Sequence, residues 1–117
     1  PIIRVARLCT ADGRPAIYCE DVVNKALVRG NYTIQDLKLP IFHFLQRFCG
    51  IYPYLDLTDL KPITADAALA ETLQVNIGAP VLFMDEVDFD IDGKPVFCSQ
   101  EYFADGFFRH TVLRKKL

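Results

Sequence analysis

The chain has 117 residues, of which 51% are hydrophobic, so it is the size of one domain and can bury roughly two thirds of its unfolded surface. No apolar run approaches the roughly 20 residues that span a bilayer, and the N-terminus lacks a signal-peptide pattern, which predicts a soluble, cytoplasmic protein. The net charge of −2 and the pI near 5.6 give this domain no electrostatic reason to bind nucleic acid.

The first part of the chain predicts a β-hairpin followed by a connection. Residues 2–9 are rich in β-formers and run into Asp12-Gly13, a strong hairpin signal. Residues 15–23 are then the expected partner strand. The polar segment 29–38 has no clear period, and we expect a loop with at most one helical turn.

The middle of the chain predicts two helices around one strand. Pro40 fits the first turn of a helix whose apolar residues recur at helical spacing up to the natural stop at Gly50. Residues 51–60 are predicted to be a strand. Thr64 or Asp66 can cap a short helix that ends at residue 73.

The last part predicts three strands, over residues 81–89, 96–103 and 107–113, with Asp92-Gly93 as the first turn. Strands dominate, hairpins join neighbours, and no βαβα alternation occurs. We therefore expect the α+β class, with an antiparallel β-sheet and helices packed on one side.

Residues 88–99, DFDIDGKPVFCS, also match the first half of a twelve-residue calcium loop, through Asp88, Asp90, Asp92 and Gly93. Such a loop needs a bidentate Glu at position 12 and helices on both sides. Position 12 is Ser99, and the flanking runs alternate as strands do. A hairpin whose acids face water is therefore the favoured interpretation.

The four cysteines, at positions 9, 19, 49 and 98, are widely spaced and predict free, buried thiols rather than a disulfide framework. Only His43 and His110 accompany them, and the spacing of a structural zinc site is missing. We therefore expect no metal site, and nothing in the sequence implies a cofactor.

Aromatic rings and polar groups share faces of two predicted strands. Tyr18 and Glu20 share one face of residues 15–23, and Phe97, Ser99, Glu101 and Phe103 share one face of residues 96–103. This mixture suits a small-molecule pocket. Solvated acids and core rings would give the same pattern, and periodicity alone leaves both interpretations open.

Catalytic groupings are weaker. Cys98 and His110 lie on runs that could be neighbours, but no third residue stands out to orient the imidazole. Glu20 and Glu101 could act as an acid and a base, yet sequence alone does not bring them together. We expect no catalytic residues and no enzyme.

Four stretches together resemble a known family: RVARLCTADGRPAIYCE, LPIFHFLQRFCGI, ITADAALAETLQVNIGAPVLFMDEVDFDIDGKPV and SQEYFADGFFRH. Their order and spacing look like the UTRA domain, the effector-sensing C-terminal domain of HutC-subfamily GntR-type bacterial transcription regulators. The matching positions are Arg7, Leu8, Asp12, Gly13, Pro15, Leu73, Gly78 to Leu82 and Asp92 to Val96. The resemblance covers nearly the whole chain and implies a chorismate lyase-like fold.

The resemblance also implies a function. Residues 1–117 would be an effector-binding and dimerisation domain that holds a small metabolite on its sheet and forms a homodimer. Binding would shift the dimer between DNA-binding states, and a winged helix-turn-helix preceding Pro1 would make the only contact with DNA. Arg7 matches a basic position that takes the phosphate in sugar-phosphate-sensing members.

Several polar positions of the family are altered here. Pro40 stands where the helix-start hydroxyl would be, Phe42 where Tyr is common, and Phe97 where Glu is frequent. The usual Arg and Pro are missing from EDVVNKALV. These departures favour an aromatic or apolar effector, such as an organic acid held by Arg7, over a sugar phosphate.

The expected ligand-binding residues are Arg7, Tyr18, Glu20, Phe42, Phe97, Ser99, Tyr102 and Phe103. Tyr102 alternates away from Phe103, so both face one pocket only if the strand bulges before Ala104. Two other functions stay open. One is a chorismate lyase-like enzyme acting on a small aromatic carboxylate, with charge from Arg7 and Arg109; the other is a dimerisation module without a ligand.

Overall fold

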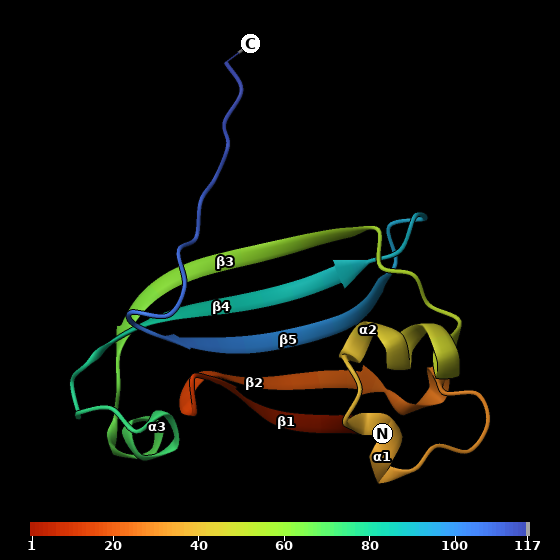
Figure 1. The fold of residues 1–117 in the computed structure, drawn as a ribbon. Helices are drawn as coiled ribbons and strands as arrows, with labels where there is room; N and C mark the ends of the chain where they lie inside the picture. Colours follow the sequence, from red (N-terminus) through yellow and green to blue (C-terminus); the bar gives the residue numbers. More distant parts are fainter. Residues whose placement is uncertain (117) are drawn as a thin grey trace.

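The computed structural model describes residues 1–116, which form a five-stranded antiparallel sheet with short helices (Figure 1). The strands are β1 (Ile2–Ala11), β2 (Arg14–Asn24), β3 (Leu55–Thr64), β4 (Pro80–Phe89) and β5 (Pro95–Ala104), in the order β1-β2-β5-β4-β3. The helices are a 3-10 turn (Lys25–Leu27), α1 (Ile34–Leu37), α2 (Ile41–Phe44), its π-helical continuation (Leu45–Cys49) and α3 (Ala67–Leu73). The predicted α+β class and antiparallel sheet are confirmed.

Both Asp-Gly turns join neighbouring antiparallel strands, as predicted. Asp12 and Gly13 have φ angles of 52° and 75°, the pair of positive values that a type I′ two-residue hairpin requires. The β4–β5 connection is longer and spans residues 90–94. Within it the Asp90 carboxylate accepts hydrogen bonds from the backbone N–H groups of Asp92 and Lys94, each at 2.9 Å.

Residues 88–99 are therefore a hairpin and not a calcium loop, since they run from β4 into β5 without a flanking helix. The prediction that all the acids face water is wrong for Asp88, of which only 3% is exposed. Asp90 and Asp92 lie at the loop, where the chain leaves the sheet, whereas Asp88 still belongs to β4 and follows its alternation.

The sheet has two faces because side chains alternate along each strand. On the first, the α2 face, α2 and its π-helical continuation pack Phe44, Leu45 and Phe48 into a core. This core also takes in Ile3 and Val23, which are paired across β1 and β2. The helix predicted from Pro40 to Cys49 is confirmed, and Gly50, with a φ of 62°, ends it in the left-handed conformation.

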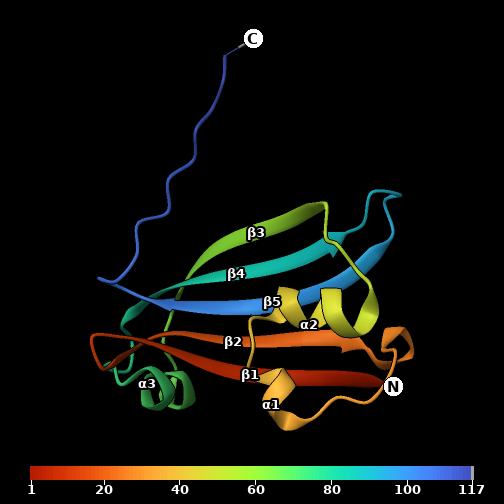
Figure 2. The same cartoon turned by 45° about the vertical axis from the view of Figure 1, so that its right-hand side comes forward.

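The opposite face, the α3 face, has its own smaller core. Ala70 and Leu73 of α3 pack with Val81 and Ala104, whose positions alternate away from the α2 face. Figures 1 and 2 show α1 and α2 at one end of the sheet and α3 at the other. Because the core under α2 and the core under α3 lie on opposite faces, the helices divide between the two faces of the sheet. This corrects the expectation that helices cover only one side.

Two predicted strands differ from the structure. The strand expected at residues 51–60 begins four residues later, and β3 tolerates Pro62 because it lies at the sheet edge with β4 as its partner. Residues 107–113 form no strand. The preceding strand, β5, already has β2 and β4 on its two sides, so the following segment finds no free edge beside it and runs away from the sheet (Figures 1 and 2).

The four cysteines are free, as predicted, but Cys49 is the one that is buried, and Cys9 is exposed. In the part of the chain that the structure describes, no helix is long and apolar enough to cross a membrane.

Candidate functional site

The α2 face carries a pocket of about 450 Å³, which we call the Arg7 pocket. It lies where β1, β2 and β5 meet the segment that leads into α2. Its lining residues are Arg7, Cys9, Cys19, Asp21, Lys38, Pro40, Ile41, Phe42, Glu86, Phe97, Ser99 and Glu101.

An ion pair lies on the strands that line this pocket. Arg7 Nε is 3.3 Å from Asp21 Oδ2, and Ser99 Oγ donates a 2.7 Å hydrogen bond to Asp21 Oδ1. Arg7 Nη1 donates to the carbonyl of Leu39, just before α2. Two buried nitrogens of Arg7 have no hydrogen-bond acceptor among residues 1–116: Nη2, and Nε, which lies in the ion pair with Asp21 without forming a hydrogen bond. A guanidinium with unused donors on a pocket wall suits a ligand that brings an oxygen acceptor.

The opposite part of the pocket is apolar and aromatic. The rings of Phe42 and Phe97 pack edge to face, with their centroids 6.0 Å apart. Pro40 and Ile41 extend this wall. The pocket therefore combines an apolar surface with a few placed polar groups, as small-molecule sites do.

The pocket is also rich in carboxylates. Burial raises the pKa of Asp21, although the Ser99 hydrogen bond and Arg7 act in the opposite direction. Burial likewise raises the pKa of Glu101, and burial with neighbouring Asp88 raises the pKa of Glu86 to about 8. Against these three carboxylates stand two cations, Arg7 and Lys38.

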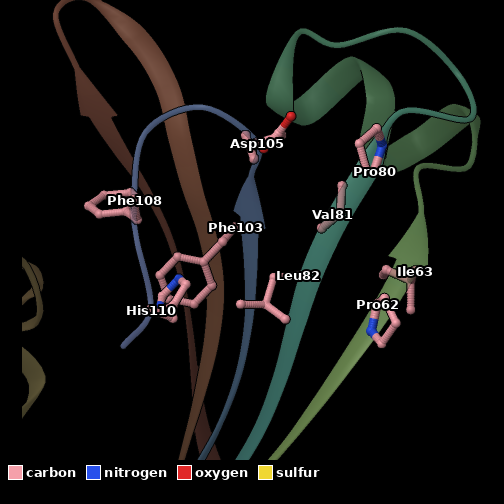
Figure 3. A pocket seen from close by; sticks show the side chains of 10 residues that line it. Pro62, Ile63, Pro80, Val81, Leu82, Phe103, Asp105, Phe108 and His110 are labelled. Atoms are coloured by element: carbon pink, nitrogen blue, oxygen red, sulfur yellow. The ribbon is translucent and has the colours of Figure 1, made fainter. Parts of the chain in front are cut away.

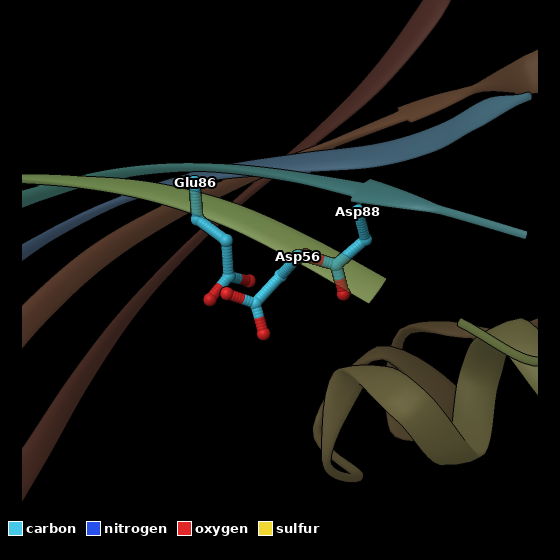
Figure 4. Close-up of side chains that lie close together, drawn as sticks. All are labelled: Asp56, Glu86 and Asp88. Atoms are coloured by element: carbon cyan, nitrogen blue, oxygen red, sulfur yellow. The ribbon is translucent and has the colours of Figure 1, made fainter. Parts of the chain in front are cut away.

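Asp56, Glu86 and Asp88 converge beside the pocket, and we call them the carboxylate trio (Figure 4). One oxygen from each lies within 4.8 Å of the others. The trio is the one group of three or more acidic, His or Cys residues within residues 1–116 that could hold a metal ion.

A second cavity, of about 290 Å³, lies at the other end of the sheet (Figure 3). Phe103 lines it and packs against His110, with the ring centroids 4.7 Å apart and the planes nearly perpendicular. Phe108 completes an aromatic cluster from the segment after β5.

Four of the eight expected ligand-binding residues come together in the Arg7 pocket: Arg7, Phe42, Phe97 and Ser99. Three lie on the α3 face, where Tyr18 donates a 2.8 Å hydrogen bond to Glu20 and stacks near Tyr102 at 5.9 Å. The bulge before Ala104 that would have turned both Tyr102 and Phe103 to one pocket is absent, because β2 and β5 pair in register from residue 98 to residue 103. Phe103 therefore shares the α2 face with Arg7 but lines the second cavity.

Sequence reasoning missed Asp21 and Glu86, which line the pocket beside Arg7. Alternation places Asp21 on the face of β2 opposite to Tyr18 and Glu20. The missing information was the strand register, which pairs Arg7 with Cys19, two residues from Asp21. The residue types could be read from the sequence, but which of them lie side by side depends on strand pairing, which belongs to the tertiary structure.

The candidate catalytic pairs are not brought together. Glu20 is paired with Gln100, and Glu101 with Cys19, so the two glutamates point to opposite faces. Cys98 lines a small hollow with Arg4 on the α3 face, whereas His110 packs on Phe103 of the α2 face.

A sequence model of the UTRA domain matches residues 1–108. A GntR-family transcriptional regulator from Enterococcus faecalis superposes with a TM-score of 0.84 at 19% identity, over 97% of this chain and 81% of that one. The possible transcriptional regulator YydK from Bacillus subtilis gives 0.86 at 20% identity, over 97% of this chain and 50% of that one. PhnF from Mycobacterium smegmatis gives 0.82 at 16% identity, over 99% and 52%. No curated protein matches the sequence.

Fold and pocket together define an α+β domain with a cavity on one face of its sheet. The chain belongs to the UTRA domain family, since the family match covers most of its length. It is the effector-binding type of domain found in transcription regulators. The chain spans about half the length of YydK and of PhnF.

Proposed function

We propose that the Arg7 pocket is the effector site of this domain and that its ligand is a small organic acid with an apolar or aromatic body. The unused Nη2 donor of Arg7 carries the proposal, because a buried guanidinium donor without an acceptor is uncommon. A ligand carboxylate placed there would supply that acceptor through a charge-assisted hydrogen bond.

The apolar wall supports the choice of ligand body. Phe42 and Phe97 already pack edge to face, and Pro40 brings no hydroxyl to the start of α2. A sugar phosphate presents many hydroxyl groups, and these would lose water against such a wall without gaining partners. An aromatic or branched aliphatic acid would bury its body there instead.

We also propose the regulatory context. A winged helix-turn-helix domain joined before residue 1 would bind DNA, and the effector would bias its arrangement in a homodimer in the cytoplasm. The exposed apolar side chains of β3, Leu55 and Leu57 on the α3 face and Leu60 on the α2 face, support the dimer, since symmetric association is the commonest way to cover an exposed apolar edge strand. Binding rather than turnover is the proposed role of the pocket.

A thermal-shift screen of sugar phosphates, aromatic acids and aliphatic acids tests the effector class. We expect an aromatic or aliphatic acid to give the largest rise in the melting temperature. The best ligand is then titrated calorimetrically against Arg7→Met, which should weaken binding by about 1.5–3 kcal/mol, roughly 10- to 150-fold.

Arg4→Met is the matched control, because Arg4 lies on the same strand but lines a hollow on the α3 face. It should bind as the wild type does. A sugar phosphate as the best ligand would overturn the proposed class. If the Arg7 and Arg4 variants bind the ligand with equal affinity, Arg7 does not anchor the ligand.

A further inference from the structure

The carboxylate trio joins two neighbouring strands on the α2 face. Asp56 on β3 is directly opposite Asp88 on β4, and Glu86 lies two residues before Asp88 on the same side of the strand. Figure 4 shows the three side chains turned toward one another. Since one oxygen of each lies within 4.8 Å of the others, all three reach a common point.

Asp88 is the member of the trio whose burial is hardest to explain by its contacts within the domain. It is 3% exposed, and its Oδ1 atom is buried without a hydrogen-bond partner among residues 1–116. A buried carboxylate oxygen with no donor is costly, because it has lost its water without a replacement. The atom lies in the cluster of carboxylates, where neither neighbour offers an N–H group.

No basic side chain offsets this charge. The ion pairs found within residues 1–116 are Arg7 with Asp21 and Arg47 with Asp36, and neither involves the trio. Three ionised carboxylates on adjacent strands would repel one another, since directly opposed like charges destabilise a sheet. The arrangement therefore favours an added positive charge, either a bound cation or a proton.

We propose that Asp56, Glu86 and Asp88 form a binding site for a hard divalent cation such as Mn²⁺, Mg²⁺ or Ca²⁺. Carboxylate oxygens are the ligands that these ions prefer. An ion that binds oxygen at about 2.0–2.6 Å brings its ligand atoms to within about 5 Å of one another, which the trio already satisfies. Asp56 is exposed, so water can complete the coordination from that side.

This site differs from the calcium loop that the sequence suggested and replaces the expectation that the domain holds no metal. It uses Asp88 of that loop but neither Asp90 nor Asp92, and its other two ligands come from outside the turn. Asp90 is already engaged with backbone N–H groups of the hairpin. The site rests on its own geometry and does not depend on the proposed effector.

A proton is the competing occupant. Burial and a hydrogen bond with Asp88 raise the pKa of Glu86 to about 8, so the two side chains can share a proton at neutral pH. Asp88 has a raised pKa as well, with burial as the main cause. A cation that binds here would displace that proton, whereas a site built only for the proton would not take up metal.

The experiment is a titration of the ligand-free domain with Mn²⁺, in which free Mn²⁺ is followed by electron paramagnetic resonance. We expect one saturable site per chain, with Ca²⁺ and Mg²⁺ as competitors. Asp56→Asn and Glu86→Gln should abolish saturable binding. Asp56 is exposed, so Asp56→Asn keeps the test valid even if changes at the more buried positions disturb folding.

Two control variants locate the ion. Asp59→Asn removes a carboxylate from the same strand but from the opposite face, and Asp92→Asn removes one from the hairpin loop. Both should bind Mn²⁺ as the wild type does. Absence of saturable binding by the wild type, undiminished binding by Asp56→Asn, or loss of binding in Asp92→Asn would each overturn the proposal.

Discussion

Asp21 is a buried carboxylate whose nearest cation is a single side chain, Arg7, at 3.3 Å. Replacing Arg7 by Met would leave Asp21 with the Ser99 hydrogen bond alone and no opposite charge. We expect a loss of about 1–3 kcal/mol in the free energy of unfolding, the usual penalty for a buried polar group that loses its partner. Urea denaturation near neutral pH measures it.

Asp21→Asn provides the control for this prediction. In the Arg7→Met background it removes the uncompensated charge, so the double variant should be more stable than Arg7→Met alone. Nonadditivity of this kind is expected for residues in direct contact. If Arg7→Met unfolds at the same urea concentration as the wild type, the pair contributes nothing to stability.

The cysteines offer a second residue-scale prediction, because their environments differ. Burial, with Asp21 close by, raises the pKa of Cys19 to about 12, and burial also raises the pKa of Cys49 and of Cys98. Cys9 is exposed. Since the thiolate is the reactive form, iodoacetamide at about pH 8 should modify the native domain at Cys9 first.

Mass spectrometry of peptides after brief labelling checks this order. Cys9→Ser should remove the fast-labelled site, whereas denaturation before labelling should expose all four thiols. Fast labelling of Cys19 in the native state would contradict its assigned environment.

At this scale the sequence predicted residue types better than their grouping. Arg7, Phe97 and Ser99 were expected at one site and share the Arg7 pocket. Tyr18 and Glu20 were expected with them but point to the α3 face, because alternation within a strand does not say which face its neighbour presents. The register of the β1–β2 and β2–β5 pairs decides that, and it depends on long-range pairing.

At the scale of elements, α3 depends on one capping residue. The Asp66 carboxylate accepts a 2.8 Å hydrogen bond from the backbone N–H of Leu69 in the first turn. Asp66→Ala should cost about 0.5–2 kcal/mol of stability, because an N–H at the start of the helix loses its acceptor. Thermal or urea unfolding gives the value.

The conservative variant separates capping from charge. Asn caps helices about as well as Asp, so Asp66→Asn should retain most of the stability that Asp66→Ala loses. Equal losses in both variants would show that the charge of Asp66, rather than its hydrogen bond to Leu69, stabilises this end of the domain.

The elements themselves were largely readable because their signals are local. Asp12-Gly13 fixes a two-residue hairpin through its own backbone angles, and the apolar spacing from Ile41 to Cys49 defines a helix without reference to the sheet. The start of β3 was misplaced because the tyrosines on both sides of Pro53 are β-forming residues, whereas pairing with β4 begins at Leu55. Which face each helix covers was not readable, since it follows from the sheet register.

At the scale of the whole molecule, the sheet has a strongly acidic middle on its α2 face. Asp21, Glu101 and the carboxylate trio follow one another across four neighbouring strands, with Arg7 at one end. Ionised carboxylates on this face would repel an anionic effector that approaches Arg7. A cation bound by the carboxylate trio would reduce this repulsion. The two proposals are therefore compatible, although each is tested alone.

The C-terminal segment shows why a strand pattern alone does not make a strand. Residues 107–113 have β-forming character, but a strand exists only when another strand pairs with it. Val112 and Leu113 are instead 74% and 97% exposed. Exposed apolar groups also mark β3, so the molecule presents two apolar surfaces that a second copy could cover.

The homodimer proposal can be tested on β3, where Leu57 is 65% exposed. If β3 belongs to the dimer interface, Leu57→Lys places a charge in a desolvated contact and should convert the dimer to monomer in sedimentation velocity. Ile77→Lys is the matched control, because Ile77 is 72% exposed in the loop between α3 and β4 and should leave the dimer intact. A monomeric wild type at high concentration would contradict the homodimer proposal. A Leu57→Lys variant that stays dimeric would show that the interface does not include β3.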